Sequence, residues 1–390
     1  MERQPLSVRT AQLKLSPIRE VVSKISEARQ KGIPIVDFSA GRPDFDTPRH
    51  IKEAAILAMN KGLVHYAPSI GLIELREAIC NRFYEDYKLQ IDPEDVIITM
   101  GSTEAIYVGL QSILNESDEV IVPQPMYVFY EGWCALGGAQ TITFPLKEEN
   151  EFSIKANDVK TCLTERTKAL ILTSPHNPTG QVFEEEEIAG IAELAVKKDF
   201  YVVCDDIYQY FLYEGARHVP VASFPGMKER TLIVGSMSKS YAMDGWRIGY
   251  LIAPRNVISN ALKMHQYTAN CCNTFVQYAA TAALSGPQDC VREMVEEFDR
   301  RRLLLMSCLD NLGFSYVRPR GAFYVFPSIR AFGLNSREFC DFLFREARVA
   351  AVPGDAFGSG GGGFIRMAYC LPCDAIERGM ESVRLALKKL

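Results

Sequence analysis

Between about residue 90 and residue 255, short apolar runs alternate with stretches that have the apolar spacing of amphipathic helices. The runs are apolar at every position instead of at every second one. Strands that are covered on both faces have this signature, so the pattern predicts an α/β fold with a mostly parallel sheet between two layers of helices. The predicted strands are residues 95–99, 119–122, 169–172, 201–204, 231–234 and 248–252.

The pattern changes after Pro287, where a long charged helix is predicted over about residues 288–311. Separated strands and a closing helix follow, which is typical of a smaller α+β domain. These strands are predicted near Tyr316 and over residues 323–326, 349–352 and 364–367.

Three parts of the chain are therefore expected. Residues 1–45 hold too little apolar sequence for a core of their own, so we predict an N-terminal arm that packs on the small domain or on a second subunit. Residues 46–285 would form the large domain, and residues 286–390 the small domain.

The composition, with 47% hydrophobic and 23% charged residues, is that of a soluble globular protein. No apolar run approaches the roughly 20 residues of a membrane-spanning helix. The formal net charge of −5 favours small molecules or copies of the chain as partners over nucleic acid. The N-terminal segment carries charges throughout and has no apolar signal region, so we expect a cytoplasmic protein whose 11 cysteines stay reduced.

Two patterns that can indicate a metal or nucleotide site have simpler explanations here. Cys370 and Cys373 have C-x-x-C spacing, but neither a second such pair nor a histidine lies at ligand spacing, so we expect ordinary thiols and no metal. The same holds for the adjacent Cys271 and Cys272. Residues 358–363 match G-x-G-x-x-G, yet they precede a predicted strand instead of a helix, which indicates a flexible loop.

The segment 99–105 joins a buried strand to a helix through Gly101. Free N–H groups at the start of that helix and the hydroxyls of Ser102 and Thr103 gather at the edge of the sheet where α/β folds bind ligands. The arrangement suits a phosphate group. Alternatively, Ser102 is a simple helix cap.

Two further polar groups follow predicted strands. Asn177 lies between Pro175 and Pro178, which stiffen the turn and hold the amide in one orientation, although a purely structural turn has the same pattern. Asp205 ends another apolar strand, and Tyr208 follows three residues later. A carboxylate at a buried strand end requires a cationic or hydrogen-donating partner.

The segment 235–250 carries the strongest chemical signal. Lys239 follows an apolar strand between Ser238 and Ser240, and Arg247 comes eight residues later. An amine that is removed from water beside a second cation has a lowered pKa, as a Schiff-base nucleophile requires, and the guanidinium can bind an anion. Taken alone, Lys239 would more often be a solvated surface residue, but the neighbouring residues favour the chemical interpretation.

In their order and spacing, these segments resemble the fold-type I, class I/II aminotransferases, which use pyridoxal 5'-phosphate. The resemblance runs from about Pro34 to the C-terminus and includes residues 39–45, 66–71, 321–324 and 352–354. It implies a large domain with a mostly parallel seven-stranded sheet and a smaller α+β domain. It also implies transfer of an α-amino group from an L-amino acid to a 2-oxo acid through a Schiff base on Lys239.

The resemblance assigns roles to the residues quoted above. Lys239 would form the Schiff base and then move the substrate proton, Asp205 would keep the pyridine nitrogen protonated, and Asn177 and Tyr208 would donate to the phenolic oxygen. The residues similar to the family's phosphate-binding set are Gly101, Ser102, Thr103, Ser236, Ser238 and Arg247.

Four more positions complete the implied site. Tyr127 matches the aromatic residue that stacks on the cofactor ring, and Arg366 matches the arginine that binds the substrate α-carboxylate. Gly41 would let the N-terminal segment approach that carboxylate. Tyr66 resembles a tyrosine that reaches the phosphate of the neighbouring subunit, which implies a homodimer with shared active sites.

Other outcomes stay open. A lyase or cyclase reaction, by β- or γ-elimination, replacement or ring closure, uses the same scaffold. Asp244, Cys271 with Cys272, and Thr103 depart from the usual family residues, and some members that act on acidic substrates have lysine at the position of Thr103. A non-catalytic regulator would need a helix-turn-helix or a basic stretch, and the sequence has neither.

The donor side chain is not fixed by these motifs. Specificity is expected to depend on residues near Ser16, Ile18 and Tyr127 and at the subunit boundary. The aromatic residues Tyr66, Tyr127, Phe129 and Tyr130 suggest an apolar or aromatic donor, but such rings could equally belong to a core.

Overall fold

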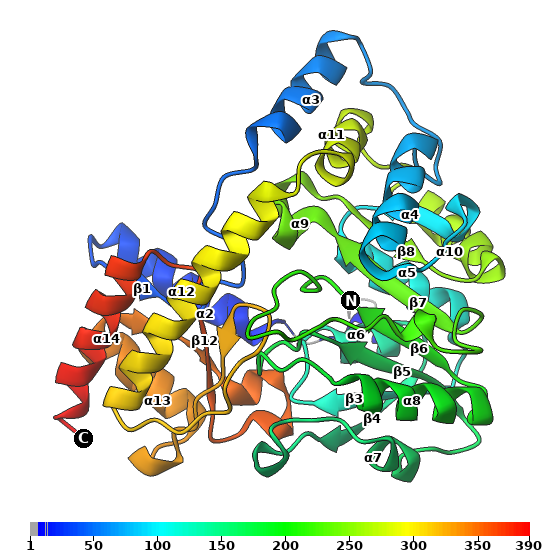
Figure 1. The fold of residues 1–390 in the computed structure, drawn as a ribbon. Helices are drawn as coiled ribbons and strands as arrows, with labels where there is room; N and C mark the ends of the chain where they lie inside the picture. The colour runs from blue at the N-terminus through cyan, green and yellow to red at the C-terminus, as the bar shows by residue number, and fades with distance from the viewer. Residues whose placement is uncertain (1–6, 12, 14) are drawn as a thin grey trace, which may run out of the picture.

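The computed structural model describes residues 7–11, 13 and 15–390. Its centre is a seven-stranded sheet in the order β2-β8-β7-β6-β5-β3-β4, and only β8 runs antiparallel to its neighbours (Figure 1). This confirms the predicted α/β class with a mostly parallel sheet. The strands are β2 (Val96–Thr99), β3 (Glu119–Gln124), β4 (Gln140–Pro145), β5 (Thr167–Thr173), β6 (Tyr201–Asp205), β7 (Thr231–Ser236) and β8 (Gly249–Ile252).

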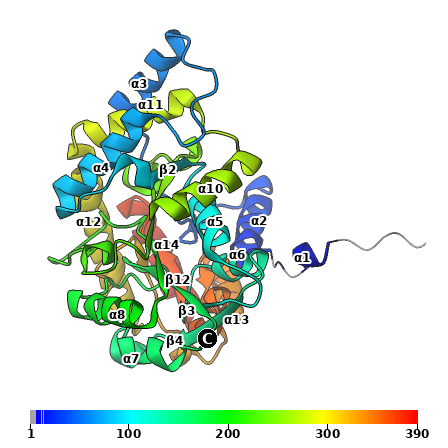
Figure 2. The same cartoon turned by 90° about the vertical axis from the view of Figure 1, so that its right-hand side faces the viewer.

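Helices cover both faces of the sheet, as the uniformly apolar strands require. Alternate residues of each strand contact different layers: Val120 and Val122 of β3 pack with α5, whereas Ile121 packs with α8. One layer holds α5 (Ser102–Ile113), α6 (Tyr130–Leu136) and α10 (Arg255–Thr268), and Figure 2 shows these three helices together. The other layer holds α3 (Arg49–Asn60), α4 (Ile73–Tyr87), α7 (Ala156–Thr161), α8 (Glu185–Lys198) and α11 (Thr274–Ser285).

The sequence pattern missed the edge strand β4. Phe144 is buried there, but Gln140, Thr143 and Pro145 are exposed. This edge strand has no continuous apolar run, so the signal that marks the other six strands is absent from it.

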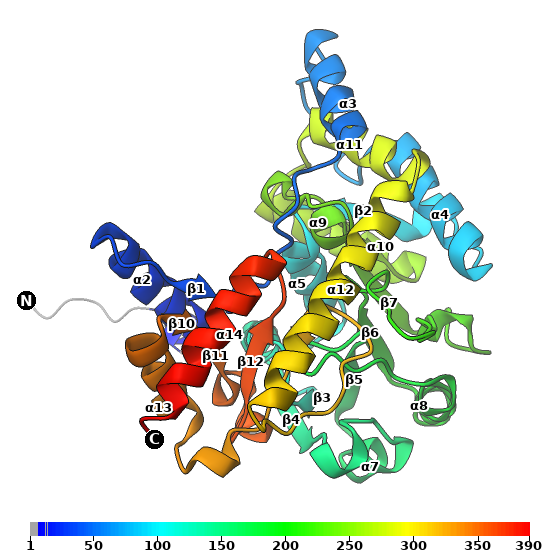
Figure 3. The same cartoon turned by 60° about the vertical axis from the view of Figure 1, so that its left-hand side comes forward.

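The C-terminal part holds the predicted charged helix, α12 (Asp289–Asn311), which runs beside α14 (Cys373–Leu387) in Figure 3. A small antiparallel sheet has the order β11 (Val352–Pro353), β12 (Ile365–Ala368), β9 (Tyr324–Val325). The expectation of a strand near Tyr316 is wrong: the chain forms only a single bridge there, between Ser315 and Ser328. The remaining helix of this part is α13 (Ser336–Phe342).

The N-terminal segment packs on the C-terminal part of the chain. Strand β1 (Val36–Asp37) pairs in parallel with β10 (Val349–Ala350), and Phe38 joins the core around α12 and α14. Helix α2 (Pro17–Gln30) contributes a 2.7 Å ion pair between Lys24 and Asp341. Residues 1–6, 12 and 14 of the predicted arm lie outside the described residues, and the domain boundaries at 45 and 285 stay predictions.

No helix in the described part of the chain is long and apolar enough to cross a membrane. All eleven cysteines fall within the described residues, and each is a free thiol.

Gly249 in β8 provides a test of how closely the sheet approaches the turn after β2. A Cβ atom at this position would lie 2.7–2.8 Å from backbone atoms of Gly101, Gly235 and Ser102, none of which can rotate away. Gly249→Ala is therefore expected to lower the free energy of unfolding by about 1–3 kcal/mol in urea titrations. Gly245→Ala is the control, because its Cβ would meet nothing within 4 Å. Equal effects of the two substitutions would contradict this packing.

Candidate active site

A cavity of about 250 Å³ lies at the carboxyl ends of β5, β6 and β7, where parallel α/β sheets bind their ligands. Apart from Gly101, Ser236 and Tyr66, every site residue predicted from the sequence lines it. The predicted residues on its wall are Gly41, Ser102, Thr103, Tyr127, Asn177, Asp205, Tyr208, Ser238, Lys239, Arg247 and Arg366.

Lys239 lies on the short helix α9 (Met237–Ser240), which begins directly after β7. The Ser236 hydroxyl caps this helix and accepts a 3.1 Å hydrogen bond from the Ser238 N–H. The Lys239 Nζ donates to the Gly41 carbonyl at 2.6 Å. Removal from water lowers the pKa of this amine, and the positive charges of Arg366 and Arg247 act in the same direction. The site therefore makes the neutral, nucleophilic form of the amine easier to reach than it is in water.

Asp205 ends β6 with its carboxylate only half satisfied. Its Oδ2 accepts a 2.7 Å hydrogen bond from the Tyr130 hydroxyl, which also lies 2.7 Å from Thr173 Oγ1. Its Oδ1 is buried and has no hydrogen-bond partner. Burial raises the pKa of Asp205 to about 6. A buried carboxylate with a free oxygen at a cavity wall fits a protonated ring nitrogen as its missing donor.

The turn between β2 and α5 forms an anion site with Arg247. Gly101 has a φ of +82°, and a Cβ there would lie 2.6 Å from the Arg247 guanidinium, so only glycine allows this approach. Arg247 donates to the carbonyls of Asp244 at 2.9 Å and Met100 at 3.3 Å. The first N–H groups of α5 have no partners within the helix. These donors and the guanidinium together fit a phosphate group.

Arg366 on β12 is 2% exposed and donates to Asn177 Oδ1 and to the Ser39 carbonyl, each at 3.0 Å. The guanidinium lies 4.3 Å from the centre of the Tyr324 ring, and its Nε has no partner. Among the described residues, no carboxylate forms an ion pair with it. A buried, uncompensated guanidinium on a cavity wall is suited to bind a carboxylate in a bidentate pair.

Two other predicted contacts have defined geometry. The Asn177 oxygen accepts from Arg366, so its NH₂ group is oriented by that bond and free to donate. A Cβ at Gly41 would lie 2.7 Å from the Tyr324 hydroxyl, which explains a glycine at this position.

Tyr208 and Tyr127 complete the wall. The Tyr208 hydroxyl lies 2.9 Å from that of Tyr324, and burial raises the pKa of Tyr208 well above its usual value, so the phenol stays protonated. The Tyr127 ring packs against those of Phe129, Tyr130 and Trp133, with centroids 5.4–6.2 Å apart. This cluster gives the cavity an aromatic face.

Tyr66 lies outside the cavity, in the loop between α3 and α4, and is 88% exposed. In Figure 1 this loop is at the far end of the molecule from the C-terminal part. Within one chain Tyr66 therefore does not form part of the cavity wall.

Sequence reasoning missed Thr173, Trp133 and Tyr324 as cavity residues, and it named Tyr130 only as an aromatic residue that suggests an apolar donor. Thr173 is the last residue of β5, and the strand-end rule that singled out Asp205 also applies to it. Tyr130 and Trp133 lie on one turn of α6, where aromatic residues usually indicate core, so their spacing alone carried no functional signal.

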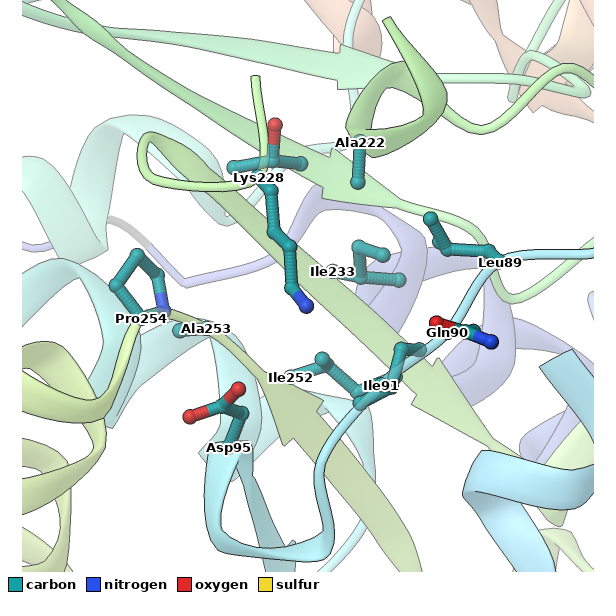
Figure 4. A pocket seen from close by; sticks show the side chains of 11 residues that line it. Leu89, Gln90, Ile91, Asp95, Ala222, Lys228, Ile233, Ile252, Ala253 and Pro254 are labelled. Carbon is teal, nitrogen blue, oxygen red and sulfur yellow. The ribbon is translucent and has the colours of Figure 1, made fainter. Parts of the chain in front are cut away.

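A second cavity, of about 30 Å³, lies at the opposite end of β7 and is lined mainly by apolar side chains such as Leu89, Ile91 and Ile252 (Figure 4). Its charged lining residues are Asp95 and Lys228. The volume is enough for about one water molecule and is too small for an amino acid.

Residues 33–383 match the sequence model of the family described as Aminotransferase class I and II. Aromatic-amino-acid aminotransferase 2 of Thermococcus litoralis is 40% identical over 91% of this chain and 92% of its own length. Aspartate aminotransferase of Pyrococcus abyssi is 41% identical over the same shares. The structure of Thermus thermophilus aspartate aminotransferase with maleate has a TM-score of 0.94, with 36% identity over 98% of this chain and 100% of that one.

The cavity chemistry agrees with the cofactor of this family. The free oxygen of Asp205, the desolvated amine of Lys239 and the anion site at Gly101 and Arg247 match a pyridine nitrogen, an aldehyde and a phosphate, respectively. The chain therefore belongs to the class I and II aminotransferases and is an aminotransferase that depends on pyridoxal 5'-phosphate.

Proposed function

We propose that this enzyme transfers the amino group of an L-amino acid with an apolar or aromatic side chain to a 2-oxo acid. The observation that carries this proposal is the composition of the cavity wall: Arg366 is buried and has no carboxylate partner among the described residues, and aromatic and aliphatic side chains share the rest of the wall with polar and charged ones.

Arg366 is the proposed partner of the substrate α-carboxylate. Its planar fork can form two parallel hydrogen bonds with a carboxylate, and the rings of Tyr324 and Phe357, 4.3 and 4.9 Å away, restrict its orientation. Burial strengthens this pair because little water competes for either charge.

The preference for an apolar donor follows from how the cations of the cavity wall are used. Arg366, Arg247 and Lys239 are the arginine and lysine side chains on the cavity wall, and the proposal already assigns each of them a partner. A second carboxylate on the substrate would therefore find no further arginine or lysine among the described residues of the wall. Ile18 and Trp133 offer apolar contact instead. The relatives include both an aromatic-amino-acid aminotransferase and an aspartate aminotransferase, so the proposed donor class rests on the cavity.

The proposed residue roles follow the contacts described above. Asp205 would bind the protonated pyridine nitrogen, Asn177 and Tyr208 would donate to the phenolic oxygen, and Tyr127 would stack on the ring. When bound, pyridoxal 5'-phosphate supplies an electron-withdrawing ring that stabilises negative charge at the substrate Cα. The phosphate would be held by Gly101, Ser102, Thr103, Ser236, Ser238 and Arg247.

Lys239 is the proposed acid and base for the substrate proton. Its neutral form would accept the proton from the substrate Cα, and the resulting ammonium would hold this proton and return it later in the transfer. The Gly41 carbonyl, 2.6 Å from Nζ, orients the amine, and Gly41 itself lies in the segment whose Ser39 carbonyl accepts from Arg366.

A homodimer is the proposed assembly. Ile56, Leu57 and Val64 are each more than half exposed, and Tyr66 and Tyr267 are 88% and 93% exposed. Exposed apolar side chains gathered on α3, the loop after it and α10 favour burial against a second copy. A cytoplasmic location stays a prediction.

A panel of amino donors tests the proposed substrate class. With 2-oxoglutarate as acceptor, kcat/KM for phenylalanine or tyrosine is expected to exceed that for aspartate at least about tenfold, because the aspartate side chain would enter the cavity unpaired. Thr103→Lys adds a cation to the wall and is expected to shift this ratio toward aspartate. A wild-type preference for aspartate would refute the proposed class but not the aminotransferase chemistry.

Asp205 gives a prediction about pH. In the cofactor-free protein its pKa is raised to about 6 from 3.8, so the folded chain holds this proton at pH values where the unfolded chain has lost it. Stability due to the protonated acid is present below about pH 4 and is lost as the pH rises through 6. The free energy of unfolding of Asp205→Asn relative to wild type is therefore expected to rise by about 3 kcal/mol between pH 4 and pH 7. Urea titrations at both pH values measure this, and a constant difference would count against the buried acid.

Mixed dimers test the proposed contribution of Tyr66. Lys239→Ala alone is expected to lose at least about 10³-fold in turnover, since no other group can move the substrate proton. Co-refolding it with Tyr66→Ala gives hybrid dimers in which one site has both native residues, so activity should recover to about a quarter of wild type. If the mixture is no more active than the two variants measured separately, Tyr66 does not serve the neighbouring site.

A further inference from the structure

Glu104 lies in the first turn of α5, directly after the phosphate-binding turn, and its carboxylate is about nine-tenths buried. Its Oε2 accepts a 2.6 Å hydrogen bond from the Met100 N–H, and its Oε1 accepts a 2.7 Å bond from the Thr268 hydroxyl. The Nδ1 atom of His265 lies 3.0 Å from the same Oε1. Glu104 therefore joins the turn to α10, which packs along α5 (Figure 2).

A negative charge at this place is unexpected on electrostatic grounds alone. The turn and Arg247 form an anion site, and a carboxylate beside it would repel a phosphate group. Burial raises the pKa of Glu104, but the hydrogen bonds from His265, Met100 and Thr268 together outweigh it, so the pKa is lowered and the group stays ionised. The Glu104 carboxylate can therefore support phosphate binding only through the hydrogen bonds that it accepts.

Those hydrogen bonds act on the backbone that shapes the anion site. The Thr99 carbonyl accepts from the Gly101 N–H at 2.8 Å, and the Thr99 hydroxyl donates to the Gly101 carbonyl at 3.1 Å, so the turn is folded tightly on itself. The bond from Met100 N–H to Glu104 is the contact that ties this turn to the side of α5. A charge-assisted bond of 2.6 Å is among the stronger hydrogen bonds in proteins.

We propose that Glu104 is a positioning residue for the cofactor phosphate: held by Thr268 and His265 of α10, it fixes the Met100–Gly101 backbone so that the first N–H groups of α5 and Arg247 converge on the phosphate. This inference rests on the proposed assignment of the phosphate to this turn. Glu104 itself does not line the cavity and touches neither the cofactor nor the substrate in this scheme.

The test compares pyridoxal 5'-phosphate with pyridoxal, which lacks the phosphate, as ligands of the cofactor-free enzyme. Dissociation constants are measured by the change in absorbance on binding. Glu104→Ala is expected to weaken binding of pyridoxal 5'-phosphate at least about tenfold, because the turn loses a charge-assisted hydrogen bond. Binding of pyridoxal should change less than about twofold. Glu104→Gln removes the charge but keeps an oxygen that accepts from Met100, so it should stay within about threefold of wild type for both ligands.

Three further variants make the outcome decisive. Thr268→Val leaves the carboxylate in place but removes one of its hydrogen-bond donors. It should also weaken binding of pyridoxal 5'-phosphate more than binding of pyridoxal, by a smaller factor than Glu104→Ala. This variant keeps the test available if Glu104→Ala does not fold. Glu74→Ala removes an exposed glutamate from the first turn of α4 and should change neither constant. Arg247→Ala should weaken pyridoxal 5'-phosphate selectively if the phosphate binds at this turn.

Equal losses for the two ligands in Glu104→Ala would show a general structural role and overturn the inference. Tighter binding of pyridoxal 5'-phosphate would also overturn it, since repulsion would then be the dominant effect of the charge. If Arg247→Ala is selective and Glu104→Ala is not, only the role of Glu104 is wrong. If Arg247→Ala is not selective, the assignment of the phosphate to this turn fails first.

Discussion

The active site depends on a carboxylate held at the buried end of a central strand with one oxygen left without a donor. Asp205 occupies this place because β6 lies in the middle of the sheet, where helices on both faces exclude water. The Tyr130 hydroxyl, which also lies 2.7 Å from Thr173 Oγ1, donates to one of its oxygens, and the other has no donor. Leaving a buried acid half satisfied is costly unless a ligand supplies the missing donor, so the fold is built to be completed by its cofactor.

The remaining charges of the cavity follow the same principle. Lys239 and Arg366 are removed from water, and neither forms an ion pair with a carboxylate among the described residues, while Arg247 lies beside a turn of N–H donors. Each group is ready for one complementary part of a ligand: a carbonyl carbon, a carboxylate or a phosphate. Such preorganisation reduces the reorganisation that is needed when substrate and cofactor bind.

Much of this arrangement could be predicted from the sequence, because strand ends and apolar runs are local signals. Asp205, Lys239 and Asn177 each follow an uninterrupted apolar run, and in parallel strands such positions meet at one edge of the sheet. Contacts made across the chain carried no comparable signal: the Tyr130 hydroxyl reaches Asp205 from 75 positions away. The same limit explains the edge strand β4, whose exposed residues break the apolar pattern, and the false strand near Tyr316. The role of Tyr66 depends on a second copy and stays a prediction.

The segment from Val36 to Gly41 connects two parts of the molecule that are far apart in sequence. Its strand β1 pairs with β10, the Phe38 carbonyl accepts from the Ala368 N–H at 2.7 Å, and the Ser39 carbonyl accepts from Arg366, so it is fastened to the C-terminal part. Yet the acceptor of the Lys239 amine, the Gly41 carbonyl, belongs to this same segment. A rotation of the C-terminal part relative to the central sheet would therefore draw that carbonyl away from the amine. The hydrogen bond between them therefore couples the position of the amine to that of the C-terminal part.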